Sequence, residues 1–559
     1  MNDRIKIIAL GGQDEYDNKM TLVEVNDDIF VLGCGKKDPD KTRPGIKYVI
    51  ANYQYLMDNK ARVKGYIITH AFDSLLGGLI YVYKDVPAPI YCSDVTRIFI
   101  SSFAEHNRVK IDFNFFIVKP TDSITVSGHK IRFFQCASNM SHSSGVAINT
   151  SYGNIVYADS FVIDHNSDPD FYYDSKALGE LANEPTLVLM CESRYSDNPG
   201  YTNPKYKLVP LVERSFHDAQ GRIFIAMAVP DAYNIVKIIG LALRNKRKII
   251  TYDEETFQTI MRVIDSHEVG KKINKSSFLP FGEINRISSK DCLVLMLGWG
   301  ERLYHKIELL ADASKFDKRI SLNETDTFII GTCYSSSTEI VANEALDELY
   351  KTDAKIISFK KNEFIRMHAS VEDLKTIISF LRPKYYVPIY GTYRELLNNA
   401  KLSLEMGLEL TYASIFILDN GNILEINEGK AKISPNSVIT GHLYVDGSGV
   451  GDISSSTLTE RQKFSDDGVL IMGVMINKGK TDIISTFDVQ MRGLVYLKDN
   501  DNLVKELTRL FEVLVQKGLD EQKPLNLIEE EVKDASFRTI RRYTGKSPLI
   551  VPYIAVANN

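Results

Sequence analysis

The short spacings by which histidine and cysteine side chains share one metal ion are missing from this sequence of 559 residues. No two histidines stand as His-x-His or His-x-x-x-His, and no two cysteines stand as Cys-x-x-Cys. Because these spacings place two side chains on the same ion, the sequence offers no local zinc motif. The ten histidines are scattered along the chain, at His70, His106, His129, His142, His165, His217, His267, His305, His368 and His442.

Long apolar runs and a surplus of positive charge are missing as well. No apolar run reaches the roughly 18 residues that a helix needs to cross a bilayer, so we expect no contact with a membrane. Residues 1–4 lead directly into the apolar segment Ile5–Leu10, which predicts that no secretory leader is present. The net charge of −5 excludes the general basic surplus of many nucleic-acid-binding proteins, but it leaves room for one basic groove.

The cysteines indicate a reducing compartment. Most of them stand in or beside apolar, strand-like segments, which is typical of reduced thiols rather than of a disulfide framework. We therefore predict a cytoplasmic protein with free thiols. The six cysteines are Cys34, Cys92, Cys136, Cys191, Cys292 and Cys333.

The first part of the chain, from Ile5 to Tyr157, is rich in short apolar segments of the kind that form strands. Helical patterns separate some of them, so we expect two packed sheets with helices outside. The clearest strand candidates are Leu22–Val25, Ile29–Leu32, Tyr66–Thr69, Ile131–Phe134 and Asn154–Tyr157.

From about Lys205 the pattern changes to a strict alternation of strand and helix. Continuous apolar strands joined by helices predict a parallel sheet that is covered on both faces. The expected strands are Arg222–Ala228, Lys248–Tyr252, Leu293–Leu297 and Thr327–Gly331, and the expected helices are Asp231–Leu243, Glu254–Ile264 and Thr338–Tyr350.

The remainder of the chain returns to mixed structure, with a strand at Tyr385–Ile389. A stretch of Glu, Gly, Lys, Ser and Pro near Glu428–Pro435 predicts a linker. After it we expect strands at Val438–Val445 and Val469–Ile476, followed by helices at Leu503–Gln516 and Leu527–Arg542.

Several blocks of the sequence resemble the ribonuclease J family, which belongs to the β-CASP branch of the metallo-β-lactamase superfamily. The segment Tyr66–Ile80 is similar to the metal-binding turn that this superfamily carries after a strand. The other blocks are Ile8–Gly12, Pro199–Thr202, Val445–Asp452, Asp467–Val469 and Arg492–Tyr496.

The resemblance implies an α/β fold: a metallo-β-lactamase αββα sandwich, an inserted β-CASP domain with a parallel sheet, and a small α+β C-terminal domain. The expected boundaries follow the changes of pattern. They place the two parts of the lactamase domain at residues 1–204 and 364–428, the β-CASP domain at 205–363, the linker at 429–440 and the C-terminal domain at 441–559.

The members of this family are ribonucleases that cleave RNA from its 5′ end and internally, with two zinc ions that activate a water molecule. Most of the expected metal ligands have been replaced here, and only His70 keeps its type. Phe72 and Leu75 put apolar bulk where imidazoles would converge. We therefore expect no metal, no cofactor and no catalytic residue. The corresponding positions are Gly33, His70, Phe72, Ser74, Leu75, Ser138, Ser160 and Tyr390.

Two features of the β-CASP motifs are retained. Glu192 matches an acidic position of the family, and His368 in the segment Met367-His368-Ala369-Ser370 matches its histidine motif, although Phe364 stands where a further histidine is expected. Without a metal centre, a structural hydrogen bond is the expected role of His368.

Three carboxylates leave an alternative open. Asp73, Asp159 and Glu192 could hold a hard cation, but no spacing rule supports this. The simpler expectations are that Asp73 caps a helix, that Asp159 is solvated or capping in an exposed turn, and that His70 caps or packs at the end of a strand.

The sequence resembles the second, weakly active or inactive paralogue that accompanies a catalytic ribonuclease J in some bacteria. It implies a subunit that binds RNA, with contacts expected at His368, Ser370, Lys271 and Lys272, and that joins a catalytic paralogue in mRNA decay and rRNA maturation as a homo- or hetero-oligomer. Two alternatives remain: an active exo- and endoribonuclease with a rearranged metal site, and a structural interaction protein that does not bind RNA.

Overall fold

The chain is organised as two compact units in the computed structural model, and each is described by itself. The first consists of Met1–Asp38 and Val49–Leu443, and the second of Pro39–Tyr48 and Tyr444–Asn559. The structure describes residues 2–39, 43–164, 172–202, 208–229, 231–265, 270, 273–312, 320–332, 334, 338–359, 368–447, 449–451, 455–477, 479, 481–494 and 500–557.

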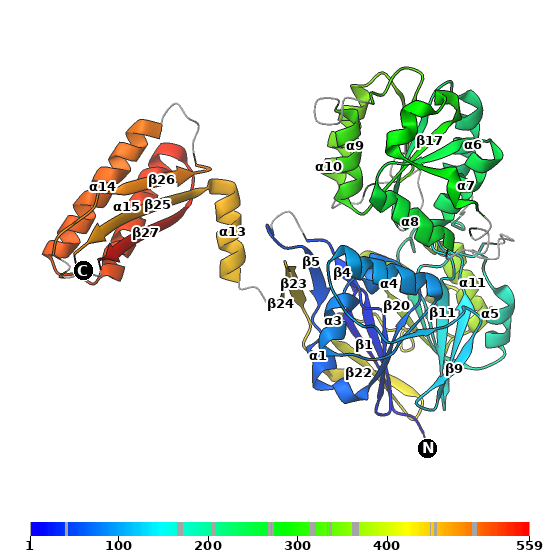
Figure 1. Ribbon diagram of the computed structural model, residues 1–559. Coiled ribbons are helices and arrows are strands. Elements are labelled where there is room, and N and C mark those ends of the chain that lie inside the picture. The colour runs from blue at the N-terminus through cyan, green and yellow to red at the C-terminus, as the bar shows by residue number, and fades with distance from the viewer. Residues whose placement is uncertain are drawn as a thin grey trace. The chain divides into compact units, whose positions relative to one another are not determined.

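Two sheets packed face to face form the base of the first unit (Figure 1). The larger sheet has the order β22 (Lys430–Ser437), β21 (Asn422–Asn427), β1 (Ile5–Gly11), β2 (Met20–Val25), β3 (Asp28–Leu32), β6 (Val63–Ile68), β7 (Ile90–Cys92) and β8 (Phe115–Ile117). The other has the order β20 (Tyr385–Ile389), β13 (Thr186–Glu192), β12 (Gly153–Ala158), β11 (Ser144–Thr150), β10 (His129–Gln135) and β9 (Ser123–Val126).

The core lies between the two sheets because their strands alternate apolar side chains toward each other. Phe30 and Leu32 of the larger sheet belong to the same buried cluster as Phe133 and Ile148 of the other. A second cluster lies between the six-stranded sheet and the helices α5 (Ser175–Ala182), α11 (Val371–Leu381) and α12 (Tyr393–Glu405). The helices α3 (Leu79–Asp85) and α4 (Asp94–His106) complete the expected αββα sandwich.

The inserted domain is built on a sheet in which every described pair of strands is parallel. Its order is β16 (Phe278–Pro280), β15 (Lys248–Thr251), β17 (Cys292–Gly298), β14 (Ile223–Ala228), β18 (Thr327–Ile330) and β19 (Lys355–Ser358). The helices are α6 (Leu208–Asp218), α7 (Ala232–Arg244), α8 (Glu254–Asp265), α9 (Glu301–Ala311) and α10 (Glu339–Tyr350). The predicted parallel α/β arrangement is therefore correct.

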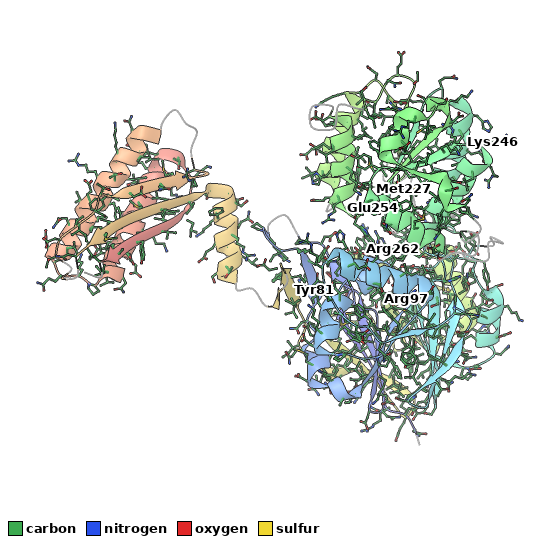
Figure 2. All side chains as sticks on the ribbon, in the orientation of Figure 1. Tyr81, Arg97, Met227, Lys246, Glu254 and Arg262 are labelled. Carbon is green, nitrogen blue, oxygen red and sulfur yellow. The ribbon has the colours of Figure 1, made fainter. Side chains whose placement is uncertain are left out.

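The inserted domain contacts the sandwich through α8 and α4. Arg262 of α8, labelled in Figure 2, donates to the Ser102 hydroxyl and lies 2.6 Å from a carboxylate oxygen of Glu105. A backbone hydrogen bond from Tyr233 N to Asn139 O, at 3.0 Å, adds a second connection.

The second unit is an α+β domain with a sheet of order β26 (Asp488–Arg492), β25 (Val469–Ile476) and β27 (Leu549–Val556). The long helices α14 (Asn500–Asp520) and α15 (Leu525–Thr544) pack on one face, where Leu470, Met472 and Phe511 are buried. The other face exposes the apolar side chains of Ile471, Met475, Val551 and Tyr553. The helix α13 (Ser455–Asp467) precedes this sheet.

The expected linker at residues 429–440 is wrong for most of its length, because Lys430–Ser437 is the strand β22. Its partner β21 ends at Asn427, which pairs with Lys430. Glu428 and Gly429 have φ values of 51° and 71°, so they form a two-residue hairpin turn. Turn residues of a hairpin have the same composition as a linker, which explains the error. The expected boundaries at 204–205 and 363–364 lie outside the described residues.

No helix among the described residues is long and apolar enough to cross a membrane.

Candidate functional site

The turn after β6 carries four of the family's ligand positions, and backbone hydrogen bonds hold it against the start of β2. His70 follows the strand directly, and α2 (Asp73–Leu76) begins three residues later. Lys19 N donates to Ser74 O at 2.9 Å, and Cys34 N donates to Leu75 O at 2.6 Å. The turn is therefore fixed by backbone contacts that depend on no side chain.

Apolar packing fills the space beside this turn. Gly33 has a φ of 78°, and a Cβ atom at this residue would lie 2.4 Å from Leu75 Cδ1. A Cβ atom at Gly35 would lie 1.7 Å from Ser74 O. The ring of Phe72 lies edge-on against His70, with 4.9 Å between the ring centroids. Close packing therefore occupies the space at Gly33, Phe72 and Leu75, where the resemblance places metal ligands.

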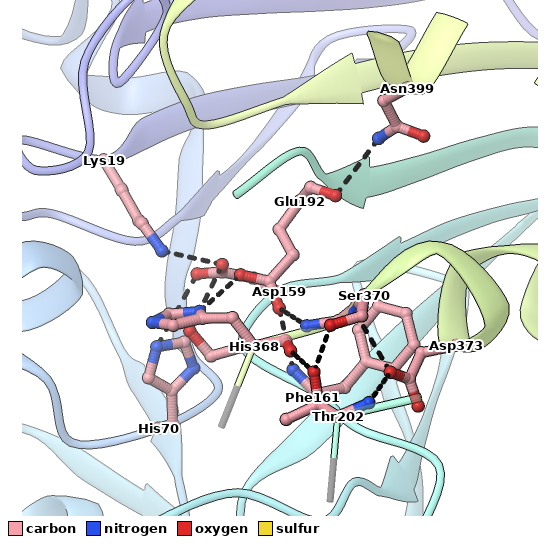
Figure 3. A network of polar contacts seen from close by, with 12 residues as sticks. Lys19, His70, Asp159, Phe161, Glu192, Thr202, His368, Ser370, Asp373 and Asn399 are labelled. Carbon is pink, nitrogen blue, oxygen red and sulfur yellow. Dashed lines mark hydrogen bonds and ion pairs between the residues drawn. The ribbon is translucent and has the colours of Figure 1, made fainter. Parts of the chain in front are cut away.

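A buried ion pair lies at the centre of the site (Figure 3). Lys19 Nζ lies 2.7 Å from Asp159 Oδ1, and both side chains are almost completely buried. The ammonium group also lies 4.9 Å from the centre of the Tyr390 ring. His70 Nε2 lies 3.6 Å from Asp159 Oδ2, which is too long for a hydrogen bond, and this nitrogen has no hydrogen-bond partner among the residues that the structure describes.

The charges of this centre follow from burial. Desolvation lowers the pKa of His70 to about 3, so its imidazole is neutral at physiological pH. Burial alone would raise the pKa of Asp159, but the charge of Lys19 and its hydrogen bond outweigh this effect, and the pKa is lowered. The centre therefore holds one fixed positive and one fixed negative charge. The expectation that Asp159 is solvated in an exposed turn is wrong, because Lys19 keeps it charged in the interior.

The remaining family positions contribute hydroxyl groups. The Tyr390 hydroxyl lies 3.0 Å from Thr21 Oγ1 and accepts a hydrogen bond of 3.2 Å from the Tyr157 hydroxyl. Ser160 Oγ donates to Asp159 Oδ1 at 3.4 Å. Ser138 is buried, and its hydroxyl has no hydrogen-bond partner within the described part of the chain.

Glu192 and His368 form a second polar group beside the ion pair. His368 Nδ1 lies 2.7 Å from Glu192 Oε2, while Glu192 Oε1 accepts hydrogen bonds from Phe161 N and Ala369 N, each at 3.1 Å. Burial and the nearby charge of Asp159 raise the pKa of Glu192 to about 8. Glu192, at the end of β13, thus connects the segment after β12 with the residues that precede α11, and both side chains are buried.

Two expectations for the surrounding residues need correction. Ser370 is fully buried, and its hydroxyl lies 2.5 Å from Thr202 Oγ1 and 2.8 Å from Asn198 Nδ2, so it offers no surface to RNA. Asp73 makes no cap, because its carboxylate pairs with Lys36 Nζ at 3.3 Å. Burial raises the pKa of Asp73 to about 6. Lys271, Lys272 and Phe364 lie outside the described residues.

The residues around Lys19 and Asp159 do not fit the pair of zinc ions that the ribonuclease J resemblance implies. Lys19 brings a positive charge to the carboxylate that would face a metal, and the described part of the chain holds no group of three or more His, Cys, Asp or Glu side chains suited to an ion. Sequence reasoning missed Lys19, Thr21 and Tyr157. The one signal for Lys19 was a lysine directly before the apolar strand Met20–Val25.

An αββα sandwich with an inserted parallel α/β domain defines a metallo-β-lactamase-fold protein. A crystal structure of a protein of unknown function from Enterococcus faecalis V583 shares the fold, with a TM-score of 0.53, 14% identity, and coverage of 76% of this chain and 100% of that chain. Residues 456–556 match the family described as the ribonuclease J C-terminal domain.

Two curated relatives extend this match over nearly the whole chain. Ribonuclease J 2 of Staphylococcus epidermidis is 27% identical over 559 residues, which are 99% of this chain and 98% of that protein. Ribonuclease J 2 of Staphylococcus aureus is 26% identical with the same coverage. The chain is therefore similar over nearly its whole length to proteins named ribonuclease J 2, and its C-terminal part matches the ribonuclease J C-terminal domain family.

Proposed function

We propose that this chain is a non-catalytic, RNA-binding subunit that joins a catalytic ribonuclease J in mRNA decay and rRNA maturation. The observation that carries the proposal is the buried ion pair of Lys19 and Asp159 at the centre of a ribonuclease J fold. Metal-assisted hydrolysis of a phosphodiester needs ions that activate water and stabilise the charge on phosphorus. Lys19 is buried and paired with Asp159, so it can neither activate a water molecule nor stabilise the charge on the phosphorus of an RNA.

The support for RNA binding is a stack of cationic and aromatic side chains near His368. Arg194 Cζ lies 4.5 Å from the ring centre of Tyr16 and 5.8 Å from that of Tyr195. The Tyr195 ring in turn lies edge-on to His368, with 5.8 Å between the centroids. Tyr16 is exposed, and Arg194 is half-buried. Aromatic rings and guanidinium planes are the groups on which bases of single-stranded RNA stack.

The support for a partner protein is the open face of the second unit's sheet. Ile471 pairs with Val551 in register, and Gly473 pairs with Tyr553. The apolar side chains of Ile471, Val551 and Tyr553 therefore form one patch on the same face of the sheet. Tyr553 is 64% exposed and Ile471 is 45% exposed. Apolar patches of this kind on a soluble domain mark interaction surfaces.

RNA binding can be tested by fluorescence anisotropy with a 5′-monophosphorylated, single-stranded RNA at low and at physiological salt. We expect weak, strongly salt-dependent binding, which Arg194→Ala weakens by about 5–30-fold because a stacking and phosphate-binding group is lost. Arg286→Ala is the matched control, since this exposed arginine pairs with Glu283 of its own short helix, Phe281–Arg286. If the unmodified chain does not bind RNA at low salt, the alternative of a structural interaction protein that does not bind RNA is favoured.

Catalysis is tested on the same RNA. We expect hydrolysis at background, unchanged in Asp159→Asn. Activity that follows the protein through purification and disappears in this variant would establish the rearranged active site instead.

Association is tested by co-purification with a catalytic ribonuclease J and by light scattering. We expect Ile471→Glu combined with Tyr553→Glu to weaken the complex, because two charges would be buried in an apolar contact. Tyr412→Glu, at an 88% exposed tyrosine of the first unit, is the control. A full-length chain that stays monomeric and captures no ribonuclease J would contradict the subunit hypothesis.

A further inference from the structure

We propose that the Lys19 ammonium is a built-in replacement for a metal ion: it supplies the positive charge that this centre of the fold requires, and it closes the centre to divalent cations. The inference deepens the proposed loss of the zinc pair, but it does not depend on RNA binding or on a partner.

The first argument is charge balance. Asp159 is 1% exposed, and a buried carboxylate without a cation is strongly destabilising. The nearest cationic group is Lys19 Nζ, 2.7 Å from Asp159 Oδ1, while His70 Nε2 lies 3.6 Å from Asp159 Oδ2, too far for a hydrogen bond. In the described part of the chain, the 2.7 Å ion pair with Lys19 is therefore the contact that compensates the charge of Asp159.

The second argument is that the position of the ammonium group is fixed. Lys19 N donates to Ser74 O at 2.9 Å, and Lys19 O accepts from Gly35 N at 3.0 Å, so the backbone of the lysine is tied to the turn that carries the former ligand positions. The Tyr390 ring covers the ammonium at 4.9 Å. A side chain held at both its backbone and its end gives a charge at a fixed place, as a bound ion would.

The third argument is the unused nitrogen of His70. Its Nδ1 lies 3.0 Å from Thr69 Oγ1, which fixes the ring, and its Nε2 lies beside Asp159 without a hydrogen-bond partner. Figure 3 shows Lys19 and His70 both directed at the Asp159 carboxylate. Neutral imidazole nitrogen and carboxylate oxygen are the ligand types that zinc prefers. Removing the lysine side chain would therefore leave a space between two potential metal ligands.

The test uses the full-length protein and its variant Lys19→Ala in thermal unfolding. We expect the variant to melt about 5–10 °C lower, because a buried carboxylate has lost its partner. Zinc or cobalt should recover at least half of this loss in the variant and leave the unmodified protein unchanged. Methylammonium, compared with sodium at the same ionic strength, should also recover part of it, since it restores the missing group.

Two further variants identify the cause. Lys19→Met keeps most of the side-chain volume without the charge, so it should be destabilised like Lys19→Ala but show no recovery with metal. Adding Asp159→Asn to Lys19→Met should raise the melting temperature, because the uncompensated charge is then removed. If Lys19→Ala does not fold, the comparison of Lys19→Met with the double variant Lys19→Met and Asp159→Asn still tests the inference.

The outcomes separate this inference from the proposed function. Stoichiometric zinc in the unmodified protein would overturn both the replacement of a metal ion by Lys19 and the proposed non-catalytic role. A Lys19→Ala protein that is as stable as the original, or a Lys19→Met protein that Asp159→Asn destabilises further, would overturn the replacement of a metal by Lys19 and leave the proposed non-catalytic role untouched.

Discussion

The neutral, buried His70 predicts a specific dependence of stability on pH. The pKa of His70 is about 3 in the folded chain, whereas a histidine in the unfolded chain titrates near 6.5. As the pH falls through this window, the unfolded chain binds a proton that the folded chain does not, so acid favours unfolding. Lowering the pH from about 7.5 to about 5 should cost about 2 kcal/mol through this residue alone.

The assay is urea unfolding at the two pH values, with the unmodified protein compared with His70→Phe. Phenylalanine keeps the ring volume but binds no proton, so its stability should fall by about 2 kcal/mol less between the two conditions. His217→Asn is the control, since His217 is an exposed residue near the end of α6. An equal loss of stability in His70→Phe and in the unmodified protein would show that His70 is not held neutral, and the account of the buried centre would fail.

Three further predictions concern the metal, the turn and the thiols. Elemental analysis should find no stoichiometric zinc, and a chelator should not lower the melting temperature, because the residues of the centre do not fit the metal pair. Gly35→Ala should cost more than about 3 kcal/mol in urea unfolding, since its Cβ would lie 1.7 Å from Ser74 O, whereas Gly179→Ala, in open space on α5, should stabilise by about 0.5–1 kcal/mol; equal effects would contradict the packing of the turn. In a Cys333→Ser variant a thiol reagent should react only as fast as the chain unfolds, because burial raises the pKa values of the remaining thiols; a fast phase with the folded protein would refute this. Those thiols are Cys34, Cys92, Cys136, Cys191 and Cys292.

The elements of the inserted domain were predictable because their signals are local. The expected strand Lys248–Tyr252 is β15 at Lys248–Thr251, and Asp231 caps α7 by accepting a hydrogen bond from Asn234 N at 3.2 Å. Apolar runs and capping residues lie within a few positions of the structure they specify. The hairpin at Glu428 and Gly429 was missed because the same residue types serve turns and linkers.

The centre was less predictable because its partners are far apart in the sequence. Lys19 and Asp159 are separated by 140 positions, and no spacing rule connects them. The resemblance placed the bridging ligand at Ser160, whereas the carboxylate in the centre belongs to Asp159, one residue earlier. A family pattern shows which ligands have been replaced, but it does not show which new side chain has taken over their charge.

The close fit of Gly33 against Leu75 also bears on how this protein can evolve. The resemblance places an acidic side chain where Gly33 stands, and a Cβ atom at this residue, which has a φ of 78°, would lie 2.4 Å from Leu75 Cδ1. Replacing Leu75 first would leave a cavity in a fully buried position, at a cost of about 2–5 kcal/mol. Each single substitution toward a set of zinc ligands therefore gives a less stable protein. The positive charge of Lys19 would also repel a zinc ion that could otherwise stabilise such a variant. A set of zinc ligands like that of the ribonuclease J family would therefore require several substitutions at once, among them changes at Gly33, Leu75 and Lys19.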